Sequence, residues 1–204
     1  MSFFKALGKV ASVAISFLDD AVNSGPVTIS LKYMDMLNEH RPKMTYNEKN
    51  MLDDAFRLFR KYEPLNEKFK EDDYKYKQVK KVIDTNKEKM NESIHLVLAS
   101  YKKISPEHYN ELLINHKNIS DLYRGVISFC TSSKVDSDII FLDSIKDFQK
   151  EINEINSIIS EENKNLLKLG AHKNESKQPR DMAKRDFLDA AKKLKIFGDE
   201  YLKK

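Results

Sequence analysis

Residues 145–169, IKDFQKEINEINSIISEENKNLLKL, carry the clearest repeating pattern in this chain. Apolar side chains recur at the a and d positions of a heptad: Ile145, Phe148, Ile152, Ile155, Ile159, Leu166 and Leu169. Glu162 is the single polar residue in this series. The pattern predicts a long helix whose apolar stripe packs against another helix. These residues are therefore candidates for self-association or for binding a partner helix, and Glu162 would help to set the register.

A second long helix is predicted over residues 65–104, where apolar residues are again spaced by three, four and seven. Its apolar residues are Phe69, Tyr76, Val79, Ile83, Met90, Ile94, Val97, Tyr101 and Ile104. The 204 residues include no Trp and only five Gly and five Pro. The low content of Gly and Pro, which form turns, favours long helices over sheets. The sequence thus predicts an all-α fold, an elongated antiparallel helical bundle or coiled coil with a separate N-terminal amphipathic helix.

The breaks between these patterns divide the chain into three predicted parts. An amphipathic helix over residues 1–23 precedes a helical bundle over residues 24–170, with long helices at about 65–104 and 137–169. Gly170 is expected to end the second of these, and residues 171–204 to form a polar linker followed by a basic helix from Pro179. Pro64 is expected to separate or kink two helices, and Thr45 with Glu48 has the spacing of a capping box.

The N-terminal stretch, residues 1–22, reads MSFFKALGKVASVAISFLDDAV and sorts its side chains onto two faces of a helix. One face is apolar and the other is polar, with Lys5, Lys9, Asp19 and Asp20 on the polar side. Such a face suits the boundary between lipid headgroups and acyl chains. The candidate membrane-binding residues are Phe3, Phe4, Lys5, Leu7, Lys9 and Phe17. The alternative is that this helix packs on the bundle and completes its core.

Charge is distributed unevenly although the net charge is only +4. Residues 135–169 contain four Lys against eight acidic residues, whereas residues 170–204 contain ten Lys and Arg against six. A basic patch is expected at Lys184, Arg185, Lys192, Lys193 and Lys195. Such a patch attracts anionic lipid, an acidic partner or the phosphates of a nucleic acid. Non-specific nucleic-acid binding is the third hypothesis for function, behind membrane and protein partners.

Chemistry-bearing motifs are few in this sequence. Glu92 and His95 have the spacing of half a di-iron motif, but the second pair that such a site needs is missing. Cys130 follows an apolar run, which is typical of a buried thiol. We therefore expect no enzyme activity, no catalytic residues, no metal and no cofactor.

A single cysteine also fits a reducing compartment. The expected location is the cytoplasm, with peripheral attachment at the inner face of a membrane, because the N-terminal stretch lacks the uninterrupted apolar region of a signal peptide. The leading hypothesis is a non-enzymatic membrane-associated helical scaffold. The second is a soluble helical interaction module, such as an adaptor, inhibitor or assembly component, which could form a homo-oligomer.

Overall fold

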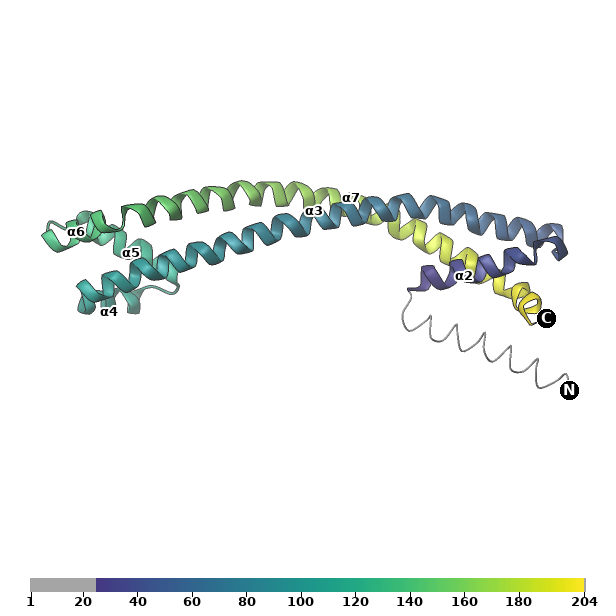
Figure 1. Ribbon diagram of the computed structural model, residues 1–204, viewed down its shortest axis with the longest axis horizontal. Helices are drawn as coiled ribbons and strands as arrows, with labels where there is room; N and C mark the ends of the chain where they lie inside the picture. The colour runs from purple at the N-terminus through teal and green to yellow at the C-terminus, as the bar shows by residue number, and fades with distance from the viewer. Residues whose placement is uncertain (1–24, 204) are drawn as a thin grey trace. The chain divides into compact units, whose positions relative to one another are not determined.

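The computed structural model describes residues 25–203, and within this range every regular element is a helix (Figure 1). The all-α prediction is confirmed. The elements are α2 (Pro26–Glu39), the 3-10 turn η1 (Arg41–Lys43), α3 (Tyr46–Ile104), α4 (Pro106–Asn115), α5 (Ile119–Ser132), α6 (Asp136–Ser144) and α7 (Lys146–Leu202). The amphipathic helix predicted over residues 1–23 lies outside the described residues.

The described chain divides into two compact units. Unit 1 comprises residues 25–73 and 172–203, and unit 2 comprises residues 74–171. The long helices α3 and α7 each contribute one part to either unit. Each unit has its own buried apolar core, so the two are described separately.

In unit 1, α3 and α7 run antiparallel. Phe59 and Tyr62 of α3 contact the fully buried Phe187 of α7, with ring centroids 5.4 and 6.4 Å apart. Asp73, further along α3, forms a salt bridge with Lys173, which lies earlier on α7. Aromatic pairs at these separations contribute about 0.5–1.5 kcal/mol beyond the area that they bury. The contacts of Phe187 therefore anchor the two helices to each other.

Helix α2 completes unit 1 by running parallel to the last turns of α7. The buried Tyr33 donates a hydrogen bond of 2.8 Å from its hydroxyl to Oδ1 of Asp199. Gly198 allows the close approach, since a Cβ there would lie 2.4 Å from the Tyr33 hydroxyl and 2.8 Å from Cδ1 of Leu37. Met34 and Leu37 are fully buried in this interface.

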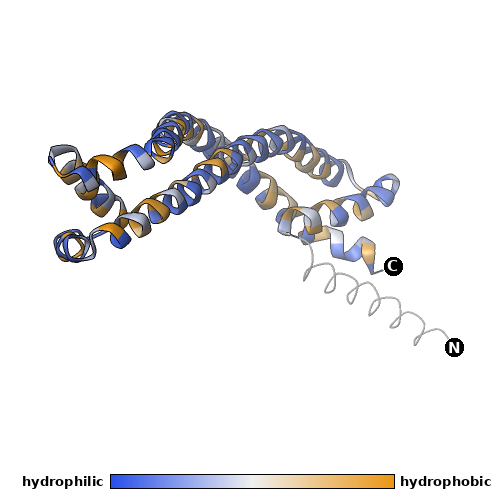
Figure 2. Ribbon diagram, turned by 60° about the vertical axis from the view of Figure 1, so that its left-hand side comes forward, coloured by the Kyte–Doolittle hydropathy of each residue, from blue (hydrophilic) through white to orange (hydrophobic). Residues whose placement is uncertain are grey.

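In unit 2, the heptad stripe of α7 packs against α3 of the same chain. Ile155 and Ile159 form a buried cluster with Ile83 of α3. Ser93 of α3 donates a hydrogen bond of 3.2 Å to Oε2 of Glu151 on α7, so the residue numbers rise on one helix as they fall on the other. The antiparallel pairing that the sequence predicted is therefore present within one chain. Figure 2 shows apolar and polar residues alternating along these helices.

The other end of unit 2 is closed by α4, α5 and α6. Tyr101 from the end of α3 and Phe141 from α6 are fully buried, with ring centroids 5.0 Å apart. Leu122, Val126 and Cys130 recur every four residues along α5 and form its buried face. This spacing explains why α5 can pack on α3 and α6 while its opposite side faces solvent.

The separation of two helices at Pro64 is wrong, because α3 is one helix from Tyr46 to Ile104 with Pro64 inside it. Proline inside a helix costs about 3 kcal/mol relative to alanine. Packing on both sides offsets that cost: Tyr62 is buried just before it, and the Phe69 ring just after it lies 3.7 Å from the guanidinium carbon of Arg180.

The polar linker predicted over residues 171–178 is also wrong, and so is the start of the last helix at Pro179. Helix α7 continues through Gly170 and Pro179. Gly170 does not have a positive φ and therefore does not end the helix. Lys173 pairs with Asp73, and Ser176 is buried with its hydroxyl donating to the Lys173 carbonyl at 3.2 Å, so this polar stretch is held against unit 1.

The long helix predicted over residues 137–169 begins later than expected. Helix α6 ends at Ser144, and Ile145 has φ −105° and ψ 6°, outside regular helical values. Ile145 is buried between α6 and α7, so it serves as a core residue at a corner. The start of α3 is as predicted: Thr45 and Glu48 form a capping box, with the Thr45 amide donating to Oε2 of Glu48 at 2.7 Å.

Candidate functional site

The polar groups around Cys130 are the strongest candidate for a catalytic site in the described residues. Cys130 is buried, and its sulfur lies 3.9 Å from Oδ1 of the buried Asp138. Burial and the neighbouring Asp138 charge raise the pKa of Cys130 to about 11. The reactive form of cysteine is the thiolate, so a thiol that stays protonated at neutral pH and has little access to solvent is a poor nucleophile.

Tyr101 and His108 form the second half of this polar cluster. The Tyr101 hydroxyl and Nδ1 of His108 are 2.7 Å apart, and the His108 ring lies against Phe129 with centroids 3.6 Å apart. Burial, followed by interaction with Cys130, raises the pKa of Tyr101 well above its usual range. These contacts join α3, α4 and α5, so the cluster satisfies buried polar groups in the core.

Metal ligands do not converge among residues 25–203, where no group of three or more His, Cys, Asp or Glu side chains is arranged to hold an ion. Glu92 and His95 are both exposed on α3. Their spacing therefore places them on the surface of unit 2, away from its buried residues.

The predicted partner-binding residues of the heptad lie in the core of unit 2. Ile145, Ile152, Ile155 and Ile159 are buried, while Phe148 and Leu166 are partly buried against the same clusters. Helix α3 covers this stripe in the single chain. Self-association through these residues would therefore require two chains to exchange helices.

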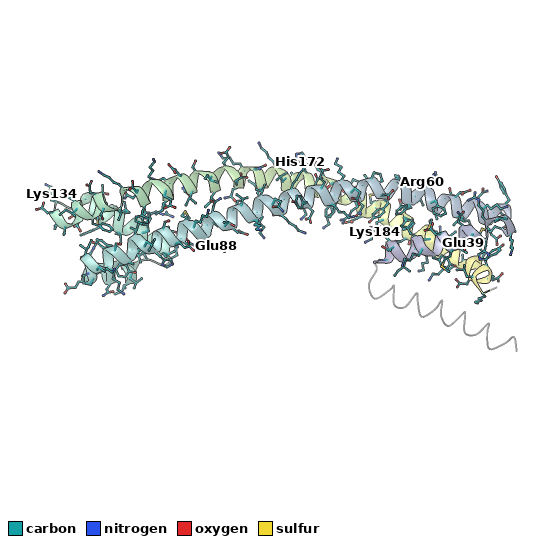
Figure 3. The ribbon with its side chains drawn as sticks, viewed as in Figure 1. Glu39, Arg60, Glu88, Lys134, His172 and Lys184 are labelled. Carbon is teal, nitrogen blue, oxygen red and sulfur yellow. The ribbon has the colours of Figure 1, made fainter. Side chains whose placement is uncertain are left out.

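The predicted basic patch lies on α7 within unit 1. Lys184 is half-buried (labelled in Figure 3), whereas Arg185, Lys192, Lys193 and Lys195 are exposed. Lys192 and Lys195 line a groove between α2 and α7 together with Ile29, Ser30, Tyr33, Leu188 and Ala191. We call this the α2/α7 groove. Sequence reasoning identified the lysines but missed the apolar residues beside them, because periodicity does not tell which apolar side chains stay uncovered.

Exposed large apolar side chains also occur on α4 and α6 of unit 2. Ile114 is 85% exposed and Ile140 is 68% exposed, and Ile139 next to it is also exposed. Such side chains can contact a partner, although among the described residues no contact between the isoleucine of α4 and those of α6 joins them into one surface. The sequence pattern did not single these residues out.

The six residues predicted to bind a membrane, Phe3, Phe4, Lys5, Leu7, Lys9 and Phe17, all lie outside the described residues. Among the described residues, no helix combines the length and the apolar character needed to cross a bilayer. Comparisons of the chain with protein-family models, curated proteins and solved structures find no match.

Proposed function

We propose that this protein is a non-enzymatic, peripheral membrane-associated helical scaffold whose membrane element is the segment of residues 1–22. The observation that carries the proposal is the sorted apolar face of that segment, with Phe3, Phe4, Leu7 and Phe17 on one side. A large apolar side chain contributes about 1.5–3 kcal/mol when fully removed from water. Four half-buried ones give reversible adsorption to a bilayer.

The charge of unit 1 supports the same proposal. The segment leads directly into α2, and the exposed Lys192, Lys193 and Lys195 belong to the same unit. A lysine near an anionic bilayer contributes about 1 kcal/mol. Anionic lipid should therefore strengthen adsorption, and added salt should weaken it.

The test is co-sedimentation of the full chain with neutral and anionic liposomes. Replacing both phenylalanines, Phe3→Asp with Phe4→Asp, removes two large apolar side chains from the lipid contact and should lower binding at least about ten-fold. Circular dichroism should show that this variant keeps the helicity and the melting temperature of the parent. Loss of the fold would instead place the segment in the core and overturn the proposal.

A matched control makes the same change at exposed apolar positions of unit 2. Ile114→Asp with Ile140→Asp removes two large apolar side chains and adds two charges, and lipid binding should persist. If this control abolishes binding while the Phe3 and Phe4 variant retains it, the membrane contact lies in unit 2 and the proposal is wrong.

A second candidate function is a soluble helical module that binds a protein partner. The exposed isoleucines of α4 and α6 favour it, because large apolar side chains left in solvent are available for contact with a partner. The control variant above serves again: Ile114→Asp with Ile140→Asp should abolish self-association in sedimentation equilibrium if the partner is a second copy. An oligomeric state that this variant leaves unchanged would contradict binding of a second copy through these residues.

A further inference from the structure

The α2/α7 groove is an open, apolar depression in an otherwise charged part of unit 1. Ile29 and Leu188 are only half-buried in it, while Tyr33 and Ala191 form its buried base. Lys192 and Lys195 stand exposed on the α7 side, and Nζ of Lys195 lies 5.9 Å from the centre of the Tyr33 ring. An occupant should therefore offer an apolar stripe bordered by negative charge.

The segment that precedes α2 is joined to the chain within reach of this groove. Helix α2 starts at Pro26, and Gly25 before it is extended and exposed. Ile29 and Tyr33 lie about 5–10 Å along α2 from its first residue at a rise of 1.5 Å per residue. Residues 17–20 lie about as many positions before residues 23–25 as Ile29 and Tyr33 lie after them. A chain reversal at residues 23–25 would therefore place residues 17–20 beside these groove residues.

The charges of the segment match the groove in the same register. On a helical wheel, Asp19 and Asp20 lie near the two borders of the polar face, next to the apolar stripe. Lys192 and Lys195 are both on the α7 side of the groove, so they meet the border that faces α7 and the aspartate on it. The two aspartates oppose adsorption to anionic lipid, so a partner with exposed lysines gives them a role that a membrane does not.

A neighbouring groove in unit 1 provides a contrast. It lies between α3 and α7, and Asp54, Asp186 and Asp189 line it together with Arg57 and Lys193. Three carboxylates would repel Asp19 and Asp20. The α2/α7 groove is the better match for the segment on charge and on distance along the chain.

We propose that the α2/α7 groove is the docking site for the chain's own residues 1–22, with their apolar face on Ile29 and Leu188 and with the aspartate on the α7-facing border, Asp19 or Asp20, against Lys192 and Lys195. Docking covers the same apolar face that would enter a bilayer. The groove and the membrane therefore compete for the segment, and the groove sets how readily the protein adsorbs. This competition rests on the membrane function proposed above.

Chymotrypsin cleavage of the full chain without lipid tests the docking by itself. This protease cuts after Phe17, Leu18 and the phenylalanines near the N-terminus, so the cleavage rate reports how often the apolar face is uncovered. Lys192→Glu with Lys195→Glu should speed cleavage there about ten-fold, because attraction between the α7 rim and the facing aspartate becomes repulsion. Adding Asp19→Lys and Asp20→Lys to that variant should restore protection. A cleavage rate that none of these changes moves would overturn the proposal.

A matched control carries Lys184→Glu with Arg185→Glu, the same change of charge on α7 outside the groove. Protection should be unchanged in this control. Protection that falls on dilution would show that another copy supplies the segment, which overturns docking within one chain.

Liposome binding then separates this proposal from the one on which it rests. Faster cleavage in the Lys192 and Lys195 variant with stronger binding to neutral liposomes supports both. Faster cleavage with no liposome binding by any variant keeps the docking site and contradicts the membrane function. Unchanged cleavage together with lipid binding that needs residues 1–22 keeps the membrane function and contradicts the docking site.

Discussion

The hydroxyl of Tyr33 on α2 donates a hydrogen bond of 2.8 Å to Oδ1 of Asp199 near the end of α7, across a sequence separation of 166 residues. This bond fixes the position of the short helix α2 on unit 1. The Tyr33 side chain is buried, so the bond allows an aromatic residue to fill the interface without leaving an unsatisfied hydroxyl.

Tyr33→Phe should lower the free energy of unfolding by about 1 kcal/mol, the usual net contribution of one hydrogen bond. Asp199→Asn keeps an acceptor oxygen and should cost less. Urea unfolding followed by circular dichroism measures both. A Tyr33→Phe variant as stable as the parent would show that this bond does not hold α2 in place.

The same bond predicts a dependence on alkaline pH. Burial, and then the hydrogen bond and charge of Asp199, raise the pKa of Tyr33 from its ordinary value of 10.0. A group whose pKa is raised by folding stabilises the protein fully below its unfolded pKa and loses that contribution as pH rises above it. Stability should therefore fall above about pH 10, and Tyr33→Phe should reduce the slope. An identical slope in the variant would contradict the raised pKa.

Two helical glycines of α7 predict opposite effects for the same substitution. Gly170→Ala should raise stability by about 0.5–1 kcal/mol, because alanine favours a helix and its Cβ would meet Tyr76 at an ordinary 3.6 Å. Gly198→Ala should lower stability, since its Cβ would fall 2.4 Å from the Tyr33 hydroxyl and 2.8 Å from Leu37.

Thermal unfolding of the two variants measures this difference. Gly170→Ala also tests whether α7 is continuous there. A linker at this position would gain nothing from alanine, whereas a helix gains the propensity difference.

Periodicity made much of this fold predictable. The heptad of residues 145–169 and the matching stripe of α3 specify two long helices with apolar faces, and these faces cover each other in unit 2. The capping box of Thr45 and Glu48 is a purely local signal and was predicted at the right residues. Both patterns depend only on nearby residues, which explains why sequence reasoning recovered them.

Continuity of the helices could not be predicted in the same way. Pro64, Gly170 and Pro179 are local helix breakers, and the contacts that overrule them join residues more than 90 positions apart, such as Asp73 with Lys173. The α2/α7 groove was missed for a related reason. The sequence pattern did not single out Ile29 or Leu188, because only the packed helices decide which apolar side chains remain uncovered.

Cys130 should react slowly with iodoacetamide in the folded protein at pH 7.5 and readily in denaturant. Its thiol is buried and its pKa is raised to about 11, so little thiolate is present at neutral pH. Mass spectrometry after timed alkylation measures both rates. Fast alkylation of the folded chain would show an accessible thiolate and reopen the question of cysteine chemistry at this site.

The same thiol adds a second alkaline effect on stability. An unfolded cysteine ionises near its ordinary pKa of 9.0, whereas the folded one stays protonated up to about 11. The folded state therefore binds more protons between these values, and stability falls by up to about 1.4 kcal/mol per pH unit. Cys130→Ala should remove the loss of stability that Cys130 causes. The difference should be seen between pH 9 and pH 10, below the range in which Tyr33 contributes. Equal slopes for variant and parent would contradict it.

Adjacent isoleucines on α7 distinguish packing within one chain from self-association. Ile159 is 7% exposed against α3, whereas Ile158 is 45% exposed. Ile159→Ala should cost about 2–5 kcal/mol of unfolding free energy, the usual range for a buried isoleucine, while Ile158→Ala should change stability by less than about 0.5 kcal/mol. Denaturant unfolding at two protein concentrations measures both.

If the heptad instead served contacts between chains, the Ile159→Ala loss of stability would shrink on dilution as the oligomer dissociates. A loss that is independent of concentration means that α3 of the same chain is the partner of this stripe.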